Sequence, residues 1–462
     1  MRVGSLALAL LGLLPIIAPL RAEWEPPIEL ARNDSSCYLA LANCWSLAAA
    51  HDTLHAVWYG RASGSFDIFY RRSPDGGLSW EPETRMSTDS VYSGYPAIAA
   101  AGSFVHLVWI QGIDARGDSY DQVRYRRSSD GGAHWDTAVQ LSYSSGGYYG
   151  AWFPCVVAQG SNVYLAWEDD RQGDDMIYFR RSTNNGLNWS AENPTGNNLG
   201  MVNASLCASG PVLLVAYADF WNECVYFQRS TDYGNTWLAK VGIPTPDVAD
   251  APCVACRDSV FHIVFCDGRN GHWDVWYRRS TDQGLTWSTD TCIMPDLYQT
   301  WTANIAVSED NVHVVRGDMG MYQVHYIASS DGGLTWSAER CLSESVPGSD
   351  AMHYSVAVSD STVHVIWDKG RYVYYRRNPG GSPTGLQDHS ALSPRRRAGP
   401  NPFVRALRMD GRERQEFEVF DFTGRRLGVF VGASVAQGLL AGVYCVRPKG
   451  VSAGRLRVVK IR

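Results

Sequence analysis

The stretch Ser329-Ser330-Asp331-Gly332-Gly333-Leu334-Thr335-Trp336 gives the chain its architecture, because close copies of it recur before it. The copies are SPDGGLSW (73–80), SSDGGAHW (128–135), STNNGLNW (182–189), STDYGNTW (230–237) and STDQGLTW (280–287). The closing tryptophans lie about 50 residues apart, a period that indicates stacked supersecondary units rather than one irregular core.

Each copy is interpreted as a tight turn between two strands. An alternating apolar strand precedes it, as in Val123-Arg124-Tyr125 and Val324-His325-Tyr326. The side chain at the third position can accept backbone N–H groups inside the turn, and the following glycine can take a positive φ. We expect the tryptophan to pack into the core where the next strand begins. The third positions are Asp75, Asp130, Asn184, Asp232, Asp282 and Asp331.

This octapeptide resembles the Asp-box, or BNR, repeat S-x-D-x-G-x-T-W of sialidases and related β-propellers. All six copies fit, and only Asn184 replaces the aspartate. In that family the box is a structural turn on the side opposite the active face. The resemblance therefore implies an all-β propeller fold and no particular reaction.

The number of blades follows from the second strand of each repeat, which is rich in the pattern V-H-x-V-W. Seven segments carry it or a looser version: 54–58, 105–109, 163–167, 212–217, 260–265, 312–315 and 363–367. The seventh unit lacks an Asp box and a fourth strand, but Trp24-Glu25-Pro26-Pro27-Ile28-Glu29-Leu30 resembles the segments that follow the boxes. We expect seven four-stranded blades over residues 23–378, with the N-terminal strand closing the ring. Six blades, as in sialidases, are the alternative.

Both termini carry further signals. Residues 1–22 have an arginine, an apolar run and a small residue at Ala22, which is typical of a signal peptide; the two prolines make a membrane anchor the weaker alternative. Residues 379–399 are rich in Pro, Gly and Ser and indicate a linker. No other stretch could span a membrane. The sequence thus predicts an exported protein.

The last segment, residues 400–462, contains alternating strands that suggest a small β-sandwich. Its Asn401-Pro402-Phe403, Val419–Arg425 and Leu440–Tyr444 stretches resemble the C-terminal sorting domain of type IX secretion substrates. The resemblance implies a partner in the secretion machinery, passage across the outer membrane, and release or surface attachment. A generic β module is the alternative.

Composition narrows the possible partners. The net charge is −6, and the C-terminal segment is basic, so the remaining body is acidic and unsuited to nucleic acid. Eleven cysteines are an odd number, so at least one is unpaired or pairs between molecules. Cys253 and Cys256 form a CxxC, but positions three apart on a strand face opposite sides. The sequence predicts no metal and no cofactor.

Candidate ligand-binding residues lie in the second-to-third loops and the connections between blades, which should share the face opposite the Asp boxes. An acidic residue followed by an arginine recurs there, with aromatic residues near the starts of the inner strands. The candidates are Asp169, Arg171, Asp267, Arg269, Asp368, Arg371, Trp152 and Trp301. Such groups suit a sugar, which stacks on rings and takes bidentate hydrogen bonds. The alternative is that each acid–arginine pair is a salt bridge tying one blade to its neighbour.

Sialidases use three arginines, a tyrosine nucleophile activated by a glutamate, and an aspartate, with the first arginine in an F/Y-R-I-P segment. This chain has no R-I-P segment, so no catalytic residue is assigned. The first functional hypothesis is a secreted or cell-surface sialidase-like propeller that binds glycan or another extracellular ligand on its loop face. The second is an exo-acting sialidase-like glycoside hydrolase, and the third is a scaffold for protein partners.

Overall fold

The computed structural model divides the chain into two compact units, residues 1–386 and 387–462. In the first unit it describes residues 24–33, 37–39, 45–62, 65–87, 91–112, 121–143, 150–196, 200–219, 222, 224–245, 249–295, 300, 302–318, 321–344 and 353–381. In the second unit it describes the backbone of four strands. Each unit is considered by itself.

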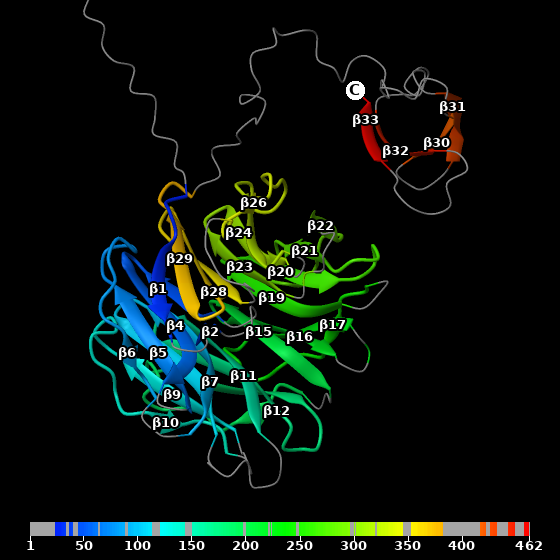
Figure 1. Ribbon diagram of the computed structural model, residues 1–462. Coiled ribbons are helices and arrows are strands. Elements are labelled where there is room, and N and C mark those ends of the chain that lie inside the picture. The colour runs from blue at the N-terminus through cyan, green and yellow to red at the C-terminus, as the bar shows by residue number, and fades with distance from the viewer. Residues whose placement is uncertain are drawn as a thin grey trace, which may run out of the picture. The chain divides into compact units, whose positions relative to one another are not determined.

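The first unit is a ring of seven antiparallel blades, as predicted, and the six-bladed alternative is excluded (Figure 1). The inner strands are β3 (Leu47–Ala50), β7 (Ser93–Ala101), β11 (Ala151–Gln159), β15 (Met201–Ser209), β19 (Ala249–Arg257), β23 (Ala303–Ser308) and β27 (Tyr354–Ser359). The second strands are β4 (Thr53–Ala62), β8 (Phe104–Gln111), β12 (Asn162–Asp169), β16 (Val212–Asp219), β20 (Val260–Asp267), β24 (Asn311–Asp318) and β28 (Thr362–Lys369). Blades 1 to 7 follow this order.

The remaining two strands of each blade lie toward the rim. The third strands are β5 (Ser65–Ser73), β9 (Gln122–Ser128), β13 (Met176–Ser182), β17 (Cys224–Ser230), β21 (Asp274–Ser280), β25 (Gln323–Ser329) and β29 (Tyr372–Asn378). The outer strands are β6 (Thr84–Arg85), β10 (Val139–Gln140), β14 (Asn193–Pro194), β18 (Val241–Gly242), β22 (Thr291–Met294), β26 (Arg340–Cys341) and β1 (Ile28–Arg32). Strand β1 pairs with β29, so the N-terminal strand completes blade 7 as predicted.

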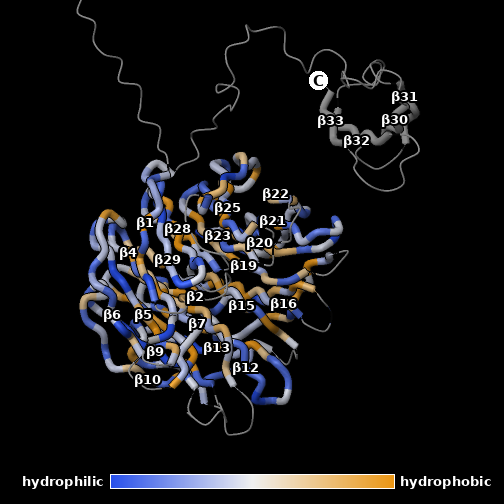
Figure 2. Tube along the Cα trace, viewed as in Figure 1, coloured by the Kyte–Doolittle hydropathy of each residue, from blue (hydrophilic) through white to orange (hydrophobic). Residues whose placement is uncertain are grey.

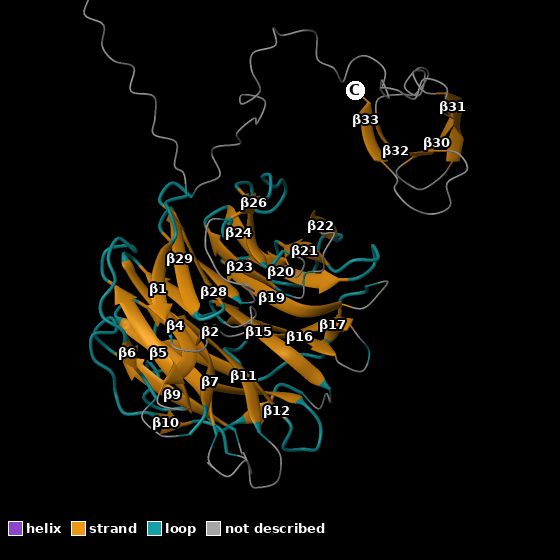
Figure 3. Cartoon of the chain, in the orientation of Figure 1, coloured by secondary structure: helices purple, strands orange, loops and turns teal. Residues whose placement is uncertain are grey.

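The described part of the chain consists of strands joined by turns and loops, and none of its residues is helical (Figure 3). Consequently, the described residues include no helix long and apolar enough to cross a membrane. In blade 1, the short strand β2 (Cys37–Tyr38) pairs with β4 alongside β3. Apolar residues follow the strands, and hydrophilic residues are frequent in the turns at the rim (Figure 2).

The Asp-box turns have the predicted internal hydrogen bonds. In the last box, Asp331 Oδ1 accepts from Thr335 N at 2.8 Å and from Ser329 Oγ at 2.7 Å. Asn184 accepts from the same two positions of its own box. Each box turn also donates a backbone hydrogen bond to the turn between the first and second strands of its blade, as Gly332 N does to Asp310 O. The boxes therefore lie on one face, and the second-to-third loops lie on the other, called the loop face.

The box tryptophans join neighbouring blades. Each packs against an aromatic ring on the third strand of the preceding blade: Trp80–Tyr375, Trp135–Tyr70, Trp189–Tyr125, Trp237–Phe179, Trp287–Phe227 and Trp336–Tyr277. Blade 7 has no box, and Trp24 packs edge-on against Tyr326 in the same way, with ring centroids 4.9 Å apart. The N-terminal segment thus supplies both the strand and the tryptophan that blade 7 lacks.

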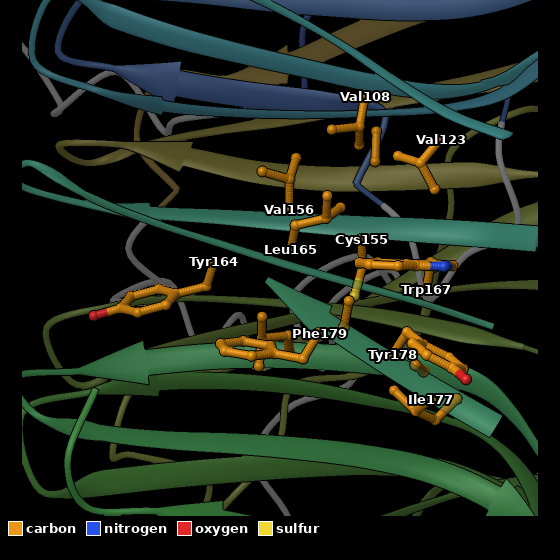
Figure 4. Close-up of a cluster of buried hydrophobic side chains, with 14 of the residues drawn as sticks. Val108, Val123, Cys155, Val156, Tyr164, Leu165, Trp167, Ile177, Tyr178 and Phe179 are labelled. Atoms are coloured by element: carbon orange, nitrogen blue, oxygen red, sulfur yellow. The ribbon is translucent and has the colours of Figure 1, made fainter. Parts of the chain in front are cut away.

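Between blades the core is apolar. Figure 4 shows Val108 and Val123 of blade 2 facing Val156 and Leu165 of blade 3, all of them buried. The inner strands of consecutive blades contact each other around the ring, from β3 to β7 and finally from β27 back to β3. Burial of these faces is the main force that holds the blades together.

Five blades also share a buried polar pair that sequence reasoning missed. A histidine of the second strand forms a hydrogen bond with a tyrosine of the third strand, with Nδ1···Oη distances of 2.7–2.8 Å. The pairs are His55–Tyr70, His106–Tyr125, His262–Tyr277, His313–Tyr326 and His364–Tyr375. Burial lowers the pKa of each histidine from 6.5 to about 3.

The second unit contains one four-stranded antiparallel sheet in the order β31-β30-β32-β33. Its strands are β30 (Glu416–Asp421), β31 (Arg426–Val431), β32 (Gly442–Pro448) and β33 (Arg457–Ile461). Strands were expected here, but the described residues include no second sheet, so the sandwich stays a prediction. The Asn401-Pro402-Phe403 motif lies outside the described residues.

Candidate ligand-binding site

The inner strands of four consecutive blades begin with the same irregularity on the loop face. Their pairing with the second strand shifts register, and the bulged residue has a positive φ: 51° at Tyr95, 43° at Phe153, 58° at Asn203 and 49° at Ala251. Non-glycine residues rarely adopt this conformation, and bulges of this kind re-aim side chains beside functional sites. The bulges of blades 2 to 5 therefore mark part of the candidate site on this face.

Six half-buried aromatic side chains extend across blades 1 to 3 on this face. They are called the aromatic surface and comprise Tyr38, Phe66, Tyr92, Tyr95, Trp152 and Phe153. Ring contacts connect them: Phe66 lies 5.8 Å from Tyr92, and Tyr95 lies 4.8 Å from Phe153 and 6.4 Å from Trp152. The buried Tyr59 joins the two halves, because its ring lies 5.4 Å from that of Tyr38 and 5.5 Å from that of Tyr95.

Polar groups border the aromatic surface at blades 3 to 5. Trp152 lies opposite Glu168 in the β11–β12 register, so the two side chains share one side of the sheet. Glu168 Oε1 accepts from the backbone N of the bulged Asn203 at 2.5 Å. Asn203 Nδ2 then donates to Asp250 Oδ1 at 3.0 Å. The bulges of blades 4 and 5 are thus tied to two acidic side chains.

Glu168 has an unusual protonation state. Burial raises the pKa of its carboxyl group to about 8, and the hydrogen bond from Asn203 opposes this only in part. At neutral pH the group is mostly a neutral acid that can donate a proton or a hydrogen bond. Asp121 in blade 2 is affected in the same direction, because burial raises its pKa to about 6.

A histidine–aspartate pair lies at the other border of the aromatic surface. His353 Nδ1 lies 2.6 Å from Asp368 Oδ2, and the His353 ring is edge-on to Tyr38. Asp368 is itself held by the backbone N of Leu39 at 2.8 Å. Burial works to lower the pKa of His353, but the adjacent Asp368 carboxylate outweighs it and raises that pKa.

Two predicted candidates, Arg171 and Arg269, are bound by carboxylates of their own blades, and Arg171 Nη1 also donates to Tyr143 O, after the outer strand of blade 2, at 3.0 Å. Arg171 Nε donates to Asp169 at 2.7 Å and Nη1 to Glu192 at 2.6 Å. In the same way, Arg269 Nε donates to Asp267 at 2.9 Å and Nη1 to Asp290 at 2.7 Å. Each guanidinium also lies over a ring, 4.4 Å from the centroid of Tyr178 for Arg171 and 3.9 Å from that of Trp276 for Arg269. These ion pairs differ from the expected bridge to a neighbouring blade, since both carboxylates belong to the arginine's own blade.

The remaining candidates are spread over the face. Arg371 is exposed, with its guanidinium 5.7 Å from the ring of Tyr372. Trp152 belongs to the aromatic surface, whereas Trp301 lies outside the described residues. The three candidate arginines belong to blades 3, 5 and 7, and no hydrogen bond or ion pair recorded among the described residues joins one to another. Within the described ranges, no three acidic, histidine or cysteine side chains are grouped as a metal ion requires.

Sequence reasoning missed Glu168 and Asn203 as site residues. One signal was present: when the seven second strands are aligned on their pairing with the third strands, the position of Glu168 holds mostly apolar or small residues elsewhere. These residues are Tyr59, Ile110, Ala218, Cys266 and Gly317, with Asp368 as the other acid. An acid at an otherwise uncharged position marks it as a candidate site.

Comparisons with known proteins agree with the repeat and the fold. Residues 52–265 match the family described as BNR repeat-like domain. No curated protein matches the chain. Among solved structures, the polysaccharide lyase Uly1 aligns with a TM-score of 0.50 at 11% identity, over 77% of this chain and 99% of the lyase.

Two further structures align less closely. YCF48 bound to D1 peptide has a TM-score of 0.47 at 15% identity, over 76% of this chain and 96% of that one. Trypanosoma rangeli sialidase in complex with 2,3-difluorosialic acid has a TM-score of 0.45 at 14% identity, over 65% of this chain and 56% of the sialidase. This chain therefore spans little more than half the length of that sialidase. At such identities the likeness concerns the fold alone, and the family match concerns the BNR repeats.

Proposed function

We propose that this protein binds a carbohydrate on the loop face of its propeller, against the aromatic surface. The observation that carries the proposal is the contact of six half-buried aromatic side chains across three blades. Aromatic faces stack against the C–H faces of sugar rings, and nearby carboxyl and amide groups take the hydroxyls. Glu168, Asn203 and Asp250 supply those polar groups on one border, and the His353–Asp368 pair supplies them on the other.

The proposed contact is tested by the variant Trp152→Ala. Trp152 is half-buried and lies beside the Glu168 acid, so its loss removes a stacking face without emptying the blade core. We expect affinity for the bound glycan to fall at least about tenfold, as for aromatic anchors in other interfaces. Calorimetric titration with a neutral β-glucan, a xylan, a polyuronate and a sialylated glycoprotein measures this for the full chain.

The matched control is Tyr233→Ala, because Tyr233 is 41% exposed and belongs to an Asp-box turn on the opposite face. It should bind as the unchanged protein does. Failure of well-folded protein to bind any of the four probes, or equal loss in both variants, would contradict the proposal. A protein-partner scaffold then becomes the better hypothesis.

The alternative, an exo-acting sialidase-like glycoside hydrolase, is favoured by one observation. Glu168 is a neutral acid at neutral pH and lies near the Asp250 carboxyl group, and glycosidases commonly use two carboxyl groups of different protonation. Against it, Arg171 and Arg269 already bind two carboxylates each. Hydrolysis of a fluorogenic sialoside that disappears in Glu168→Gln would establish the alternative, and its absence in both proteins would remove it.

We also propose that the protein is exported, with residues 1–22 as a signal peptide and residues 400–462 as a sorting domain for type IX secretion. The support is the sequence pattern of both segments. Fractionation of cells that express the chain with and without residues 400–462 tests this. The shortened protein should remain in the periplasm, whereas an unchanged distribution would contradict the assignment.

A further inference from the structure

Two cysteines from neighbouring inner strands meet between blades 4 and 5. Cys207 of β15 is buried and Cys256 of β19 is half-buried, and both pack in the same apolar cluster as Leu214 and Phe261. Strands β15 and β19 pack against each other, so the two side chains share one interface between blades. Cys207 lies two residues before the end of β15 and Cys256 one residue before the end of β19, so both are near the Asp-box face and away from the aromatic surface.

The two cysteines of the CxxC motif, Cys253 and Cys256, have different surroundings. Cys253 points into a polar cluster, where its sulfur lies 3.7 Å from Ser205 Oγ and 3.7 Å from Asn304 Nδ2. Cys256 instead faces blade 4 and Cys207. The two cysteines of the motif therefore have different neighbours, and Cys256 faces the interface between blades.

We propose that Cys207 and Cys256 form an inter-blade disulfide when the protein meets a disulfide oxidant such as oxidised glutathione. The bond would link β15 to β19 covalently and close a loop that contains the outer part of blade 4. This site does not depend on the proposed carbohydrate function, because it lies at the opposite face.

The reaction balances as a two-electron thiol–disulfide exchange. The thiolate of the more accessible Cys256 attacks one sulfur of oxidised glutathione, forms a mixed disulfide and releases one glutathione thiolate. Cys207 then loses its proton to solvent and attacks the Cys256 sulfur, which releases the second glutathione. The two protein thiols are oxidised, and the glutathione disulfide is reduced. Burial raises the pKa of the Cys207 thiol, so the second step should be slow in the folded protein.

Peptide mapping of the full chain tests the bond directly. The protein is equilibrated with oxidised glutathione, unfolded in the presence of N-ethylmaleimide and digested with trypsin. Arg229 and Lys240 lie between the two cysteines, so Cys207 and Cys256 fall on different peptides, which also carry Cys224 and Cys253. Fragmentation of the linked pair in the mass spectrometer assigns the bond to one cysteine of each peptide. We expect a linked pair of peptides that separates after reduction. Recovery of both cysteines as alkylated thiols would overturn the proposal.

Thermal unfolding provides a second measurement. A bond across a loop of this length should raise the Tm of the oxidised protein by about 5 °C relative to the reduced protein. The difference should vanish in Cys256→Ala and persist in Cys341→Ala, which removes another half-buried cysteine from a different blade. If the difference persists in Cys256→Ala, another pair of cysteines is responsible and the assignment fails.

Discussion

Lowering the pH from 6.5 to 4 is expected to unfold the propeller, because five buried histidines must stay neutral in the folded chain. Each of them is bonded to a tyrosine inside a blade, and burial lowers its pKa from 6.5 to about 3. In the unfolded chain the same residues return to ordinary values and take up protons below pH 6.5.

The direction of the effect follows from the proton balance. Between pH 6.5 and pH 3 the unfolded chain binds more protons than the folded chain, so the free energy of unfolding falls as the pH is lowered. This stability is fully present above pH 6.5. Each histidine contributes a slope of about 1.4 kcal/mol per pH unit in that window.

Buried carboxyl groups act in the opposite direction. Burial raises the pKa of Glu83, Asp170 and Asp175 above the ordinary values. Burial raises the pKa of Glu168 to about 8 and that of Asp121 to about 6, so the folded chain binds protons there before the unfolded chain does. The five histidines have large shifts, whereas three of the five carboxyl groups have smaller ones, so the net slope keeps the sign of the histidine effect and is about 2–4 kcal/mol per pH unit near pH 5. A domain stability of about 5–15 kcal/mol is then exhausted near pH 4.

Urea denaturation at a series of pH values measures this slope. The variant His262→Gln removes one titrating group, so its slope should be smaller by about 1.4 kcal/mol per pH unit, whatever its stability at neutral pH. The matched control is His272→Gln, since His272 is exposed and should leave the slope unchanged. A free energy of unfolding that stays constant from pH 6.5 to pH 4 would show that the histidines are not held neutral.

The architecture was predictable because its signals are local. The Asp-box residues fix their own turn, as the bonds of Asp331 show, and the segment after Trp24 resembled the segments after the boxes. The histidine–tyrosine pairs could not be predicted from local sequence signals. Their partners lie on different strands, and their contact depends on the pairing register, which the alternating pattern alone does not give.

Only part of the candidate site could be predicted from the sequence. Trp152 was identified because it lies near the start of an inner strand. The bulges at Tyr95, Phe153 and Ala251 were not identified, although a proline follows each of them. The acid–arginine pattern could not separate a ligand-binding arginine from a structural one, since that depends on whether another carboxylate, such as Glu192 beside Arg171, is within reach.

Removal of residues 24–33 is expected to abolish stable folding of the propeller. Without β1, strand β29 keeps an unpaired edge, and the ring depends on the packing of blade 7 against blade 1 alone. Loss of Trp24, which is 6% exposed and packs on Tyr326, costs about 3–5 kcal/mol by itself. The part-buried Glu25–Arg377 ion pair is bidentate, and its loss adds to this cost. Trp24 and the β1 ladder together therefore account for a large part of the stability of a typical domain.

The shortened protein should gain a cooperative thermal transition when a synthetic peptide of residues 24–33 is added, because the peptide can restore both the outer strand and the tryptophan. The same peptide with Trp24→Ala keeps the backbone pairing of β1 but loses the contact with Tyr326, so it should bind more weakly by at least about tenfold. If the shortened protein had the same Tm as the full chain, packing between the blades would be enough to close the ring without β1. Equal rescue by both peptides would assign the closure to strand pairing and not to the tryptophan that replaces the missing box.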